Sequence, residues 1–230
     1  MTKAIRIYEY GGPEILKYED VDIGDVGPNE VRIRHNTIGL NYIDIYQRTG
    51  LYPIGNLPKT LGMEAAGTIE EVGVNVQDFK IGDRVAYAMG LGSYCEERIW
   101  GTERLVKIPD SIEDKTAAAM LLQGMTAYYL LNRTYKVRPG DTILIYAAAG
   151  GLGLIACQWA KYLGATVIGC VGTEQKAMIA KAHGCDYPIL YREENIPERV
   201  KEITNGEGVP VVYDSIGKKT LDDSLKSLRP

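Results

Sequence analysis

The chain has 230 residues, of which 45% are hydrophobic and 24% are charged, and its formal net charge at pH 7 is -4. This length and composition are typical of a globular protein with one large domain or two smaller ones. The acidic balance and the lack of a long run of Lys or Arg argue against a nucleic-acid partner or a membrane surface, and they favour a small-molecule ligand.

The first half of the chain has the pattern of short strands. Strand patterns occur at residues 3–10, 30–41, 64–73 and 83–89, and turn signals that contain Gly separate them. This spacing predicts a β-rich, barrel-like domain over residues 1–120.

Residues 39–53, GLNYIDIYQRTGLYP, are dense in polar and aromatic side chains that a plain barrel does not need. We interpret this segment as the wall of a site. Two simpler interpretations stay open. Asn41 and Asp44 can be helix-capping residues, and the tyrosines, Tyr46 and Tyr52 among them, can be packed aromatics whose hydroxyls reach water.

The second half of the chain begins with a helix pattern at residues 111–131 and then alternates strands with amphipathic helices. Buried-strand patterns at residues 142–146 and 165–172 are each followed by a helix. Such alternation predicts right-handed βαβ units and a parallel sheet with both faces covered. We therefore predict an α/β protein with a doubly wound nucleotide-binding domain over residues 121–230.

The turn at residues 147–153, AAAGGLG, joins the first of these strands to its helix. Its last six residues match the dinucleotide fingerprint GxGxxG, with Ala148 in place of the first glycine and Gly150 and Gly153 as the other two. Gly151 adds another residue without a Cβ at a helix N-terminus, where backbone amides and the helix dipole attract phosphate. A glycine-rich turn without a ligand is the alternative.

The residues after the second strand indicate which nucleotide binds. Gly172 and Thr173 lie at the expected turn, and Lys176 can neutralise a ribose 2′-phosphate, which favours NADPH. Glu174 favours NAD if its carboxylate faces the ribose, although an exposed acid in the first turn of a helix explains it equally well.

The cysteines are scattered. Cys95, Cys157, Cys170 and Cys185 form no C-x-x-C pair, and the sequence has only two histidines. This pattern predicts neither a zinc site nor a disulfide framework. No apolar run approaches the roughly 20 residues that span a bilayer, and the start lacks a secretory signal, so we expect a cytoplasmic protein.

Several stretches together resemble a known family. They include residues 11–14 (GGPE), 41–53 (NYIDIYQRTGLYP), 61–67 (LGMEAAG), 191–195 (YREEN) and 211–217 (VVYDSIG). In these stretches the chain is similar to the zinc-free quinone oxidoreductases related to zeta-crystallin, of the medium-chain dehydrogenase/reductase superfamily. The resemblance implies a GroES-like β-barrel catalytic domain joined to a Rossmann domain, with a cleft for NADPH and an electron acceptor.

The resemblance also implies site residues. The catalytic group that it implies comprises Asn41, Asp44, Tyr46, Tyr52 and Met63. The cofactor contacts that it implies are Asn41, Tyr46, Thr126, Tyr129, Gly150, Gly151, Leu152, Gly172, Thr173, Lys176, Tyr191 and Ser215.

Zinc-dependent relatives carry a Cys and a Gly-His-Glu as metal ligands, whereas the corresponding places here hold Asn41 and Met63-Glu64. We therefore expect no metal, and chemistry limited to acceptors that are already electrophilic, such as a quinone or an activated alkene. Tyr46, Tyr52 and Asn41 are the candidate hydrogen-bond donors to the charge that develops on the acceptor.

Two alternative functions stay open. One is NADPH-dependent reduction of an enal or enone double bond in the same site, and the other is non-catalytic NADPH binding in a crystallin-like or RNA-associated protein. Members of the family continue beyond the residues that match KSLRP at 226–230 and form homodimers. We therefore expect a fragment whose Rossmann domain is incomplete at its C-terminus, and a homodimer for the full-length protein.

Overall fold

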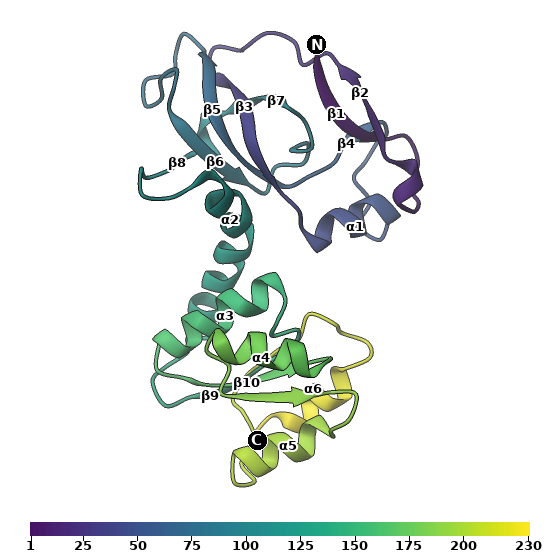
Figure 1. Ribbon diagram of the computed structural model, residues 1–230, viewed down its shortest axis with the longest axis vertical. Coiled ribbons are helices and arrows are strands. Elements are labelled where there is room, and N and C mark those ends of the chain that lie inside the picture. The colour runs from purple at the N-terminus through teal and green to yellow at the C-terminus, as the bar shows by residue number, and fades with distance from the viewer. The chain divides into compact units, whose positions relative to one another are not determined.

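A computed structural model describes residues 1–230, and Figure 1 gives its elements. The chain divides into two compact units, Met1–Leu122 and Gln123–Pro230. Helix α2, Asp114–Tyr129, crosses the boundary between them. None of the helices combines the length and the apolar character that crossing a membrane requires.

The first unit contains two antiparallel sheets. The larger has the order β7-β3-β5-β6-β8 and the smaller the order β2-β1-β4. The strands are β1 (Thr2–Ile7), β2 (Lys17–Val21), β3 (Glu30–Gly39), β4 (Lys59–Thr60), β5 (Glu64–Val72), β6 (Arg84–Ala88), β7 (Glu97–Gly101) and β8 (Val106–Lys107). A bridge between Ala4 and Cys95 joins β1 to the segment before β7 and so links the two sheets of this β-rich unit.

Alternation along β3 sets which side chains form that core. Val31 and Ile33 are fully buried and pack with Ile69 of β5. Between them, Arg32 points to the outside and pairs with Glu71 across the strand. This is the two-residue period expected of a strand with one buried face.

Helix α1, Tyr42–Thr49, fills the segment that the sequence marks as a site wall. Asn41 is its N-cap and Asp44 completes a capping box, so the capping interpretation of both residues is confirmed. Gly50 ends the helix with φ at +79°, a left-handed conformation that favours glycine. Two short 3-10 turns, Pro13–Ile15 and Thr102–Arg104, complete the unit.

The second unit is a four-stranded parallel sheet in the order β11-β10-β9-β12. Its strands are β9 (Thr142–Ile145), β10 (Thr166–Val171), β11 (Tyr187–Leu190) and β12 (Val212–Tyr213). The helices after them are α3 (Gly151–Tyr162), α4 (Glu174–Ala182), α5 (Ile196–Ile203) and α6 (Leu221–Ser227), and a π-helical turn, Leu130–Thr134, extends α2. Counted within the unit the strand order is 3-2-1-4, the first part of the doubly wound arrangement that the alternation predicts.

Successive residues of the central strands pack on opposite faces of this sheet. Ile143 belongs to a core that includes Ala156 and Ala160 of α3. Its neighbour Leu144 belongs to a second core with Ile196 and Val200 of α5. The sheet is therefore covered on both faces, which explains why its strands are continuous apolar runs.

All four cysteines are buried and free. Cys95 lies in the first unit, and the other three lie in the cores of the second.

Candidate functional site

The predicted nucleotide contacts of the second unit gather at one edge of its sheet. The glycine turn follows β9, Gly172 and Thr173 follow β10, Tyr191 follows β11, and Ser215 follows β12 within two residues. Because the strands are parallel, these positions all lie at the carboxyl ends of neighbouring strands. Open α/β sheets bind their ligands at this edge.

The glycine turn has the geometry that the fingerprint requires. Gly150 is the extended N-cap of α3, and its amide donates to the carbonyl of Ala147 at 2.8 Å. A Cβ on Gly153 would lie 2.3 Å from that carbonyl oxygen, so this position tolerates only glycine without a rearrangement of backbone. A Cβ on Gly150 would meet only that oxygen, at 3.2 Å, which leaves its other sides open to a ligand.

The residue of this turn with a left-handed backbone is Ala147, whose φ is +51°. Sequence reasoning placed Ala148 at the first glycine of the fingerprint. The side chain of Ala148 is instead fully buried in the core beneath the turn. The tight turn is therefore made one residue earlier than the motif suggests.

The first turn of α4 supplies the second half of the nucleotide edge. Thr173 caps this helix, and its hydroxyl oxygen accepts the backbone amide of Lys176 at 3.3 Å. The Lys176 side chain is exposed. A Cβ on Gly172 would lie 2.9 Å from the hydroxyl of Tyr191. The Tyr191 side chain, which follows β11, therefore lies against the turn after β10.

Asp214, which sequence reasoning missed, organises the loop that carries Ser215. Its Oδ1 accepts the amides of the second and third residues after it, and its Oδ2 accepts the hydroxyls of Thr220 and Ser224. Burial raises the pKa of this carboxyl, but these bonds together hold the pKa below its ordinary value. An Asp followed by Ser-Ile-Gly is the sequence signal of such a turn.

Two predicted contacts, Thr126 and Tyr129, lie on α2 within the second unit. Tyr129 is well exposed, whereas the ring of the preceding residue, Tyr128, lies 5.9 Å from that of Trp159 on α3. The packing of Tyr128 therefore ties this part of α2 to the helix that follows the glycine turn.

The predicted acceptor residues lie in the first unit around the start of α1. The carboxylate of Asp44 accepts the backbone amide of Asn41 at 2.8 Å. The Asn41 side-chain amide donates to Glu64 at 2.7 Å, and the Tyr94 hydroxyl donates to Asp44 at 2.7 Å. Glu64 and Tyr94 were not among the predicted site residues, because no local pattern indicates a partner 23 or 50 positions away.

Burial dominates the electrostatics of these carboxyl groups. It raises the pKa of Asp44, against the hydrogen bonds from Asn41 and Tyr94. It also raises the pKa of Glu64, against the bonds from Asn41 and from the backbone of Leu122. The pKa of the Tyr94 hydroxyl is raised by burial and by its bond to Asp44, which keeps this group a donor.

Met63 takes part in the same buried region. The side-chain amide of Gln47 donates to the Met63 sulfur at 3.2 Å. Gln47 Oε1 and Asp44 Oδ1 are buried and have no hydrogen-bond partner among the atoms of the protein. These two oxygens lie on residues one helical turn apart, and each can still accept a hydrogen bond.

Tyr46 and Tyr52 lie together beside this region. Their rings are 5.2 Å apart, and the ring of Tyr42 lies 5.2 Å from that of Tyr46. Tyr52 remains 51% exposed. The three side chains form an aromatic row whose neighbouring rings are tilted by 72° and 57°, so a flat ring can contact the face of one tyrosine and the edge of another.

No three His, Cys, Asp or Glu side chains are arranged to hold a metal ion. Asn41 and Met63 instead take part in hydrogen bonds within the first unit, Asn41 as a donor to Glu64 and Met63 as an acceptor from Gln47.

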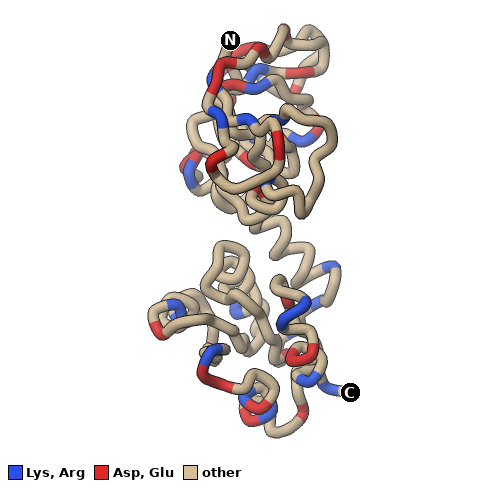
Figure 2. Tube along the Cα trace, turned by 90° about the vertical axis from the view of Figure 1, so that its right-hand side faces the viewer, with Lys and Arg blue, Asp and Glu red and all other residues tan.

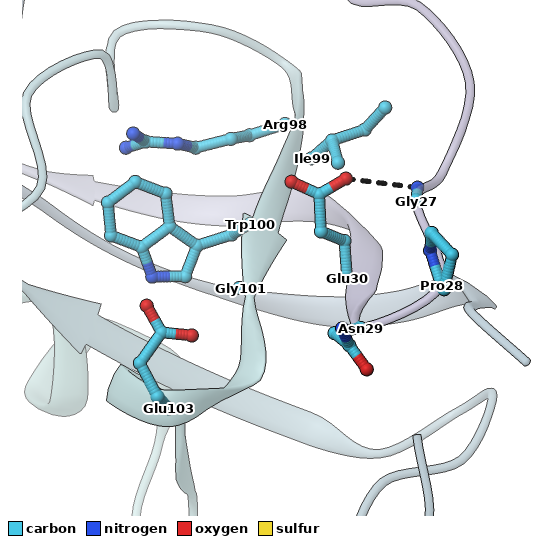
Figure 3. A pocket seen from close by; sticks show the side chains of 9 residues that line it. All are labelled: Gly27, Pro28, Asn29, Glu30, Arg98, Ile99, Trp100, Gly101 and Glu103. Carbon is cyan, nitrogen blue, oxygen red and sulfur yellow. Dashed lines mark hydrogen bonds between the residues drawn. The ribbon is translucent and has the colours of Figure 1, made fainter. Parts of the chain in front are cut away.

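A pocket of about 590 Å³ lies elsewhere in the first unit and contains none of the predicted residues (Figure 3). Arg98, the one cationic side chain that lines it, donates to the carbonyls of Gly90 and Leu91 and lies 3.8 Å from the centre of the Trp100 ring. Its guanidinium therefore already makes hydrogen bonds and a ring contact within the protein. We do not consider this pocket a candidate active site.

Two family models match the chain. The alcohol dehydrogenase GroES-like domain matches residues 27–138, and the zinc-binding dehydrogenase family matches residues 151–230. The matched ranges fall largely within the first and the second unit, respectively.

Individual proteins match along the whole chain. A quinone oxidoreductase of Pseudomonas aeruginosa is 52% identical over 100% of this chain and 71% of its own length, and a 2-haloacrylate reductase of Burkholderia is 48% identical with the same coverage. The crystal structure of Escherichia coli quinone oxidoreductase complexed with NADPH also matches, with 47% sequence identity and a TM-score of 0.96. The match covers 99% of this chain and 70% of that chain.

Proposed function

Because the chain belongs to the quinone oxidoreductase family of medium-chain dehydrogenases, we propose that it is an NADPH-dependent quinone reductase. The observation that carries the proposal is the edge of the parallel sheet, where the glycine turn and the residues after β10, β11 and β12 meet. We propose residues 1–120 as the catalytic domain and residues 121–230 as the nucleotide-binding domain.

The residues at the sheet edge fit a dinucleotide phosphate. Gly150 leaves open space where the backbone must approach the pyrophosphate, and the first amides of α3 point toward it with the positive end of the helix dipole. Thr173 and the exposed Lys176 provide a hydroxyl and a cation for the 2′-phosphate. Tyr191 lies against the same turn and offers a face to the adenine.

When bound, NADPH supplies a hydride to the acceptor. The aromatic row of Tyr42, Tyr46 and Tyr52 orients a flat ring, and the tyrosine hydroxyls and the Asn41 amide donate hydrogen bonds to oxygen that gains negative charge. A reduced quinone can take its proton from water, so no side chain is required as a general acid.

The test is an assay of NADPH oxidation by the purified chain, with para-benzoquinone or phenanthrenequinone as the acceptor. The loss of NADPH absorbance measures the rate. We expect turnover with NADPH that exceeds turnover with NADH. Binding of NADPH without consumption of either quinone, by the full-length protein as well as by this chain, would contradict the proposal and would support the non-catalytic alternative.

The relative named 2-haloacrylate reductase favours a second candidate, the reduction of an activated alkene in the same site. An alkene needs a proton at the carbon next to its activating group, which a quinone does not. If the alkene is the substrate, Tyr52→Phe should nearly abolish its reduction, because the proton donor is lost, and should slow quinone reduction far less, because a quinone loses only one hydrogen bond. Equal effects on both acceptors would count against the second candidate.

We also propose zinc independence, a homodimer of the full-length protein and a cytoplasmic location. The absence of a metal-binding cluster supports zinc independence, and four buried free thiols fit a reducing compartment. The homodimer rests on the resemblance to the family. Acidic and basic residues alternate along the Cα trace (Figure 2), which supports the expectation of no nucleic-acid partner. A chelator should leave the rate unchanged, and light scattering should give the subunit number.

A further inference from the structure

Glu64, the first residue of β5, is a buried carboxylate that the proposed mechanism does not use. It is 1% exposed, and both of its oxygens have partners. Oε1 accepts the side-chain amide of Asn41 at 2.7 Å, and Oε2 accepts the backbone amide of Leu122 at 2.7 Å. A buried acid with a donor at each oxygen is an arrangement that a neutral amide cannot reproduce.

The bond to Leu122 is unusual because this amide lies in the middle of α2. In a regular helix the amide donates to the carbonyl four residues earlier, which here belongs to Ala118. Glu64 thus accepts from an amide inside α2, which is a continuous α-helix over Asp114–Tyr129. Leu122 is also the last residue of the first unit, so the carboxylate contacts the helix where the unit ends.

Gly39, the last residue of β3, leaves space for this contact. A Cβ at Gly39 would lie 2.4 Å from Cγ of Glu64 and 2.3 Å from the carbonyl oxygen of Ala118. Any larger residue would therefore clash with the Glu64 side chain and with the backbone of α2 at the same time. Strand, carboxylate and helix thus form one close-packed group.

Two carboxylates fix Asn41 from two directions. Asp44 accepts its backbone amide, and Glu64 accepts its side-chain amide. With both groups held, the amide plane of Asn41 has little rotational freedom. Preorganisation of this kind is what an active site needs from the residues behind those that touch the substrate.

We propose that Glu64 is a positioning residue of the reductase, which fixes the side chain of Asn41 relative to the acceptor through a carboxylate anchored on the Leu122 amide. This inference rests on the proposed function, because it takes Asn41 as a residue that contacts the acceptor or the nicotinamide.

The first test is Glu64→Gln, with Glu70→Gln as the matched control. The introduced glutamine offers one acceptor oxygen, so its NH2 group must oppose one of the two donors. We expect kcat to fall at least about tenfold while the KM for NADPH changes less than about twofold, because the proposed phosphate contacts lie in the second unit. Glu70 lies on the same strand and pairs at the surface with Arg34, so its variant should keep the wild-type kcat.

The second test reads the position of Asn41 without turnover. In proton–nitrogen NMR spectra the side-chain amide of Asn41 should exchange slowly with solvent in the wild type and in Glu70→Gln, and quickly in Glu64→Gln. Unchanged signals in Glu64→Gln would overturn the proposal, and so would a kcat that falls only in proportion to the folded fraction. Loss of turnover in the wild type would instead count against the proposed function, and the NMR result would still decide the role of Glu64.

The double variant Asn41→Asp/Glu64→Gln covers the case in which Glu64→Gln fails to fold. In it the amide nitrogen of the introduced glutamine donates to the new carboxylate, and its amide oxygen accepts from Leu122. We expect thermal unfolding to return to within a few degrees of the wild-type temperature. No recovery of folding would contradict the pairing on which the proposal depends.

Discussion

His35, on β3, is held at both ring nitrogens. Nδ1 lies 2.7 Å from the carbonyl oxygen of Cys95, and Nε2 lies 2.9 Å from the hydroxyl of Tyr87. Burial lowers its pKa to about 4, with a further contribution from Arg98, against the bond to Cys95. The neutral ring is therefore part of the folded structure.

The stability of the protein should consequently depend on the charge of His35. Because the pKa in the folded state lies below the ordinary value of 6.5, the contribution is complete above pH 6.5 and is lost as pH falls toward 4. The loss should be roughly 2 to 3 kcal/mol. Urea unfolding at several pH values in this range measures the free energy of unfolding. We expect the loss in the wild type and not in His35→Gln. Asp44 and Glu64 have raised pKa values, so they add stability as pH falls, in the wild type and in the variant alike. The difference in stability between the two proteins therefore reports His35 alone.

Lys176 should determine the choice between the two nucleotides. Lys176→Ala should raise the Kd for NADPH roughly tenfold and change the Kd for NADH less than about twofold, because only NADPH carries the 2′-phosphate. Fluorescence titration measures both constants. Lys181→Ala, near the other end of α4, is the control. If the two variants weaken NADPH equally, Lys176 acts only through the general charge of the helix.

Some residues of the candidate site could be identified from the sequence, and others could not. Asn41 and Asp44 were found because they share one short segment and one helix start. Glu64 and Tyr94 were missed, since their bonds to that segment arise only when distant strands pair. The Asn41–Glu64 bond thus follows from tertiary structure rather than from a motif.

At the scale of elements, the turn between β9 and α3 separates two uses of glycine. Gly153→Ala should lower the free energy of unfolding by roughly 1 to 3 kcal/mol, because the new Cβ meets the carbonyl of Ala147. Gly150→Ala should leave stability within about 1 kcal/mol of the wild type and weaken NADPH binding roughly tenfold. Chemical denaturation and nucleotide titration of both variants test this. The reverse pattern would mean that Gly150 serves packing and does not face the phosphate.

The elements of the second unit were more predictable than those of the first. Its strands are buried on both faces and alternate with helices, so the pattern predicts a parallel sheet with right-handed crossovers and leaves only a few strand orders. In the first unit the order β7-β3-β5-β6-β8 pairs strands that are distant in the chain. Local patterns found these strands but contain no information on which of them are neighbours.

At the scale of the whole molecule, each unit has its own core. Hydrogen exchange should therefore respond to NADPH unevenly. We expect the strongest slowing in the segments after β9 and β10 and around Tyr191 and Ser215, with little change in the buried centres of β3 and β6. Mass spectrometry of peptides with and without nucleotide measures the pattern. Equal slowing in both units would contradict a phosphate site at the edge of the second sheet.

The burial of every cysteine matters for an enzyme of this proposed chemistry. Quinones are soft electrophiles that arylate thiolates, and only an accessible, ionised sulfur reacts quickly. Cys95 is the most exposed of the four at 8%, and burial raises its pKa to about 11, while the other three lie within the cores of the nucleotide-binding unit. The folded chain therefore offers a quinone no accessible nucleophilic sulfur, so a quinone is not expected to inactivate the protein through these thiols.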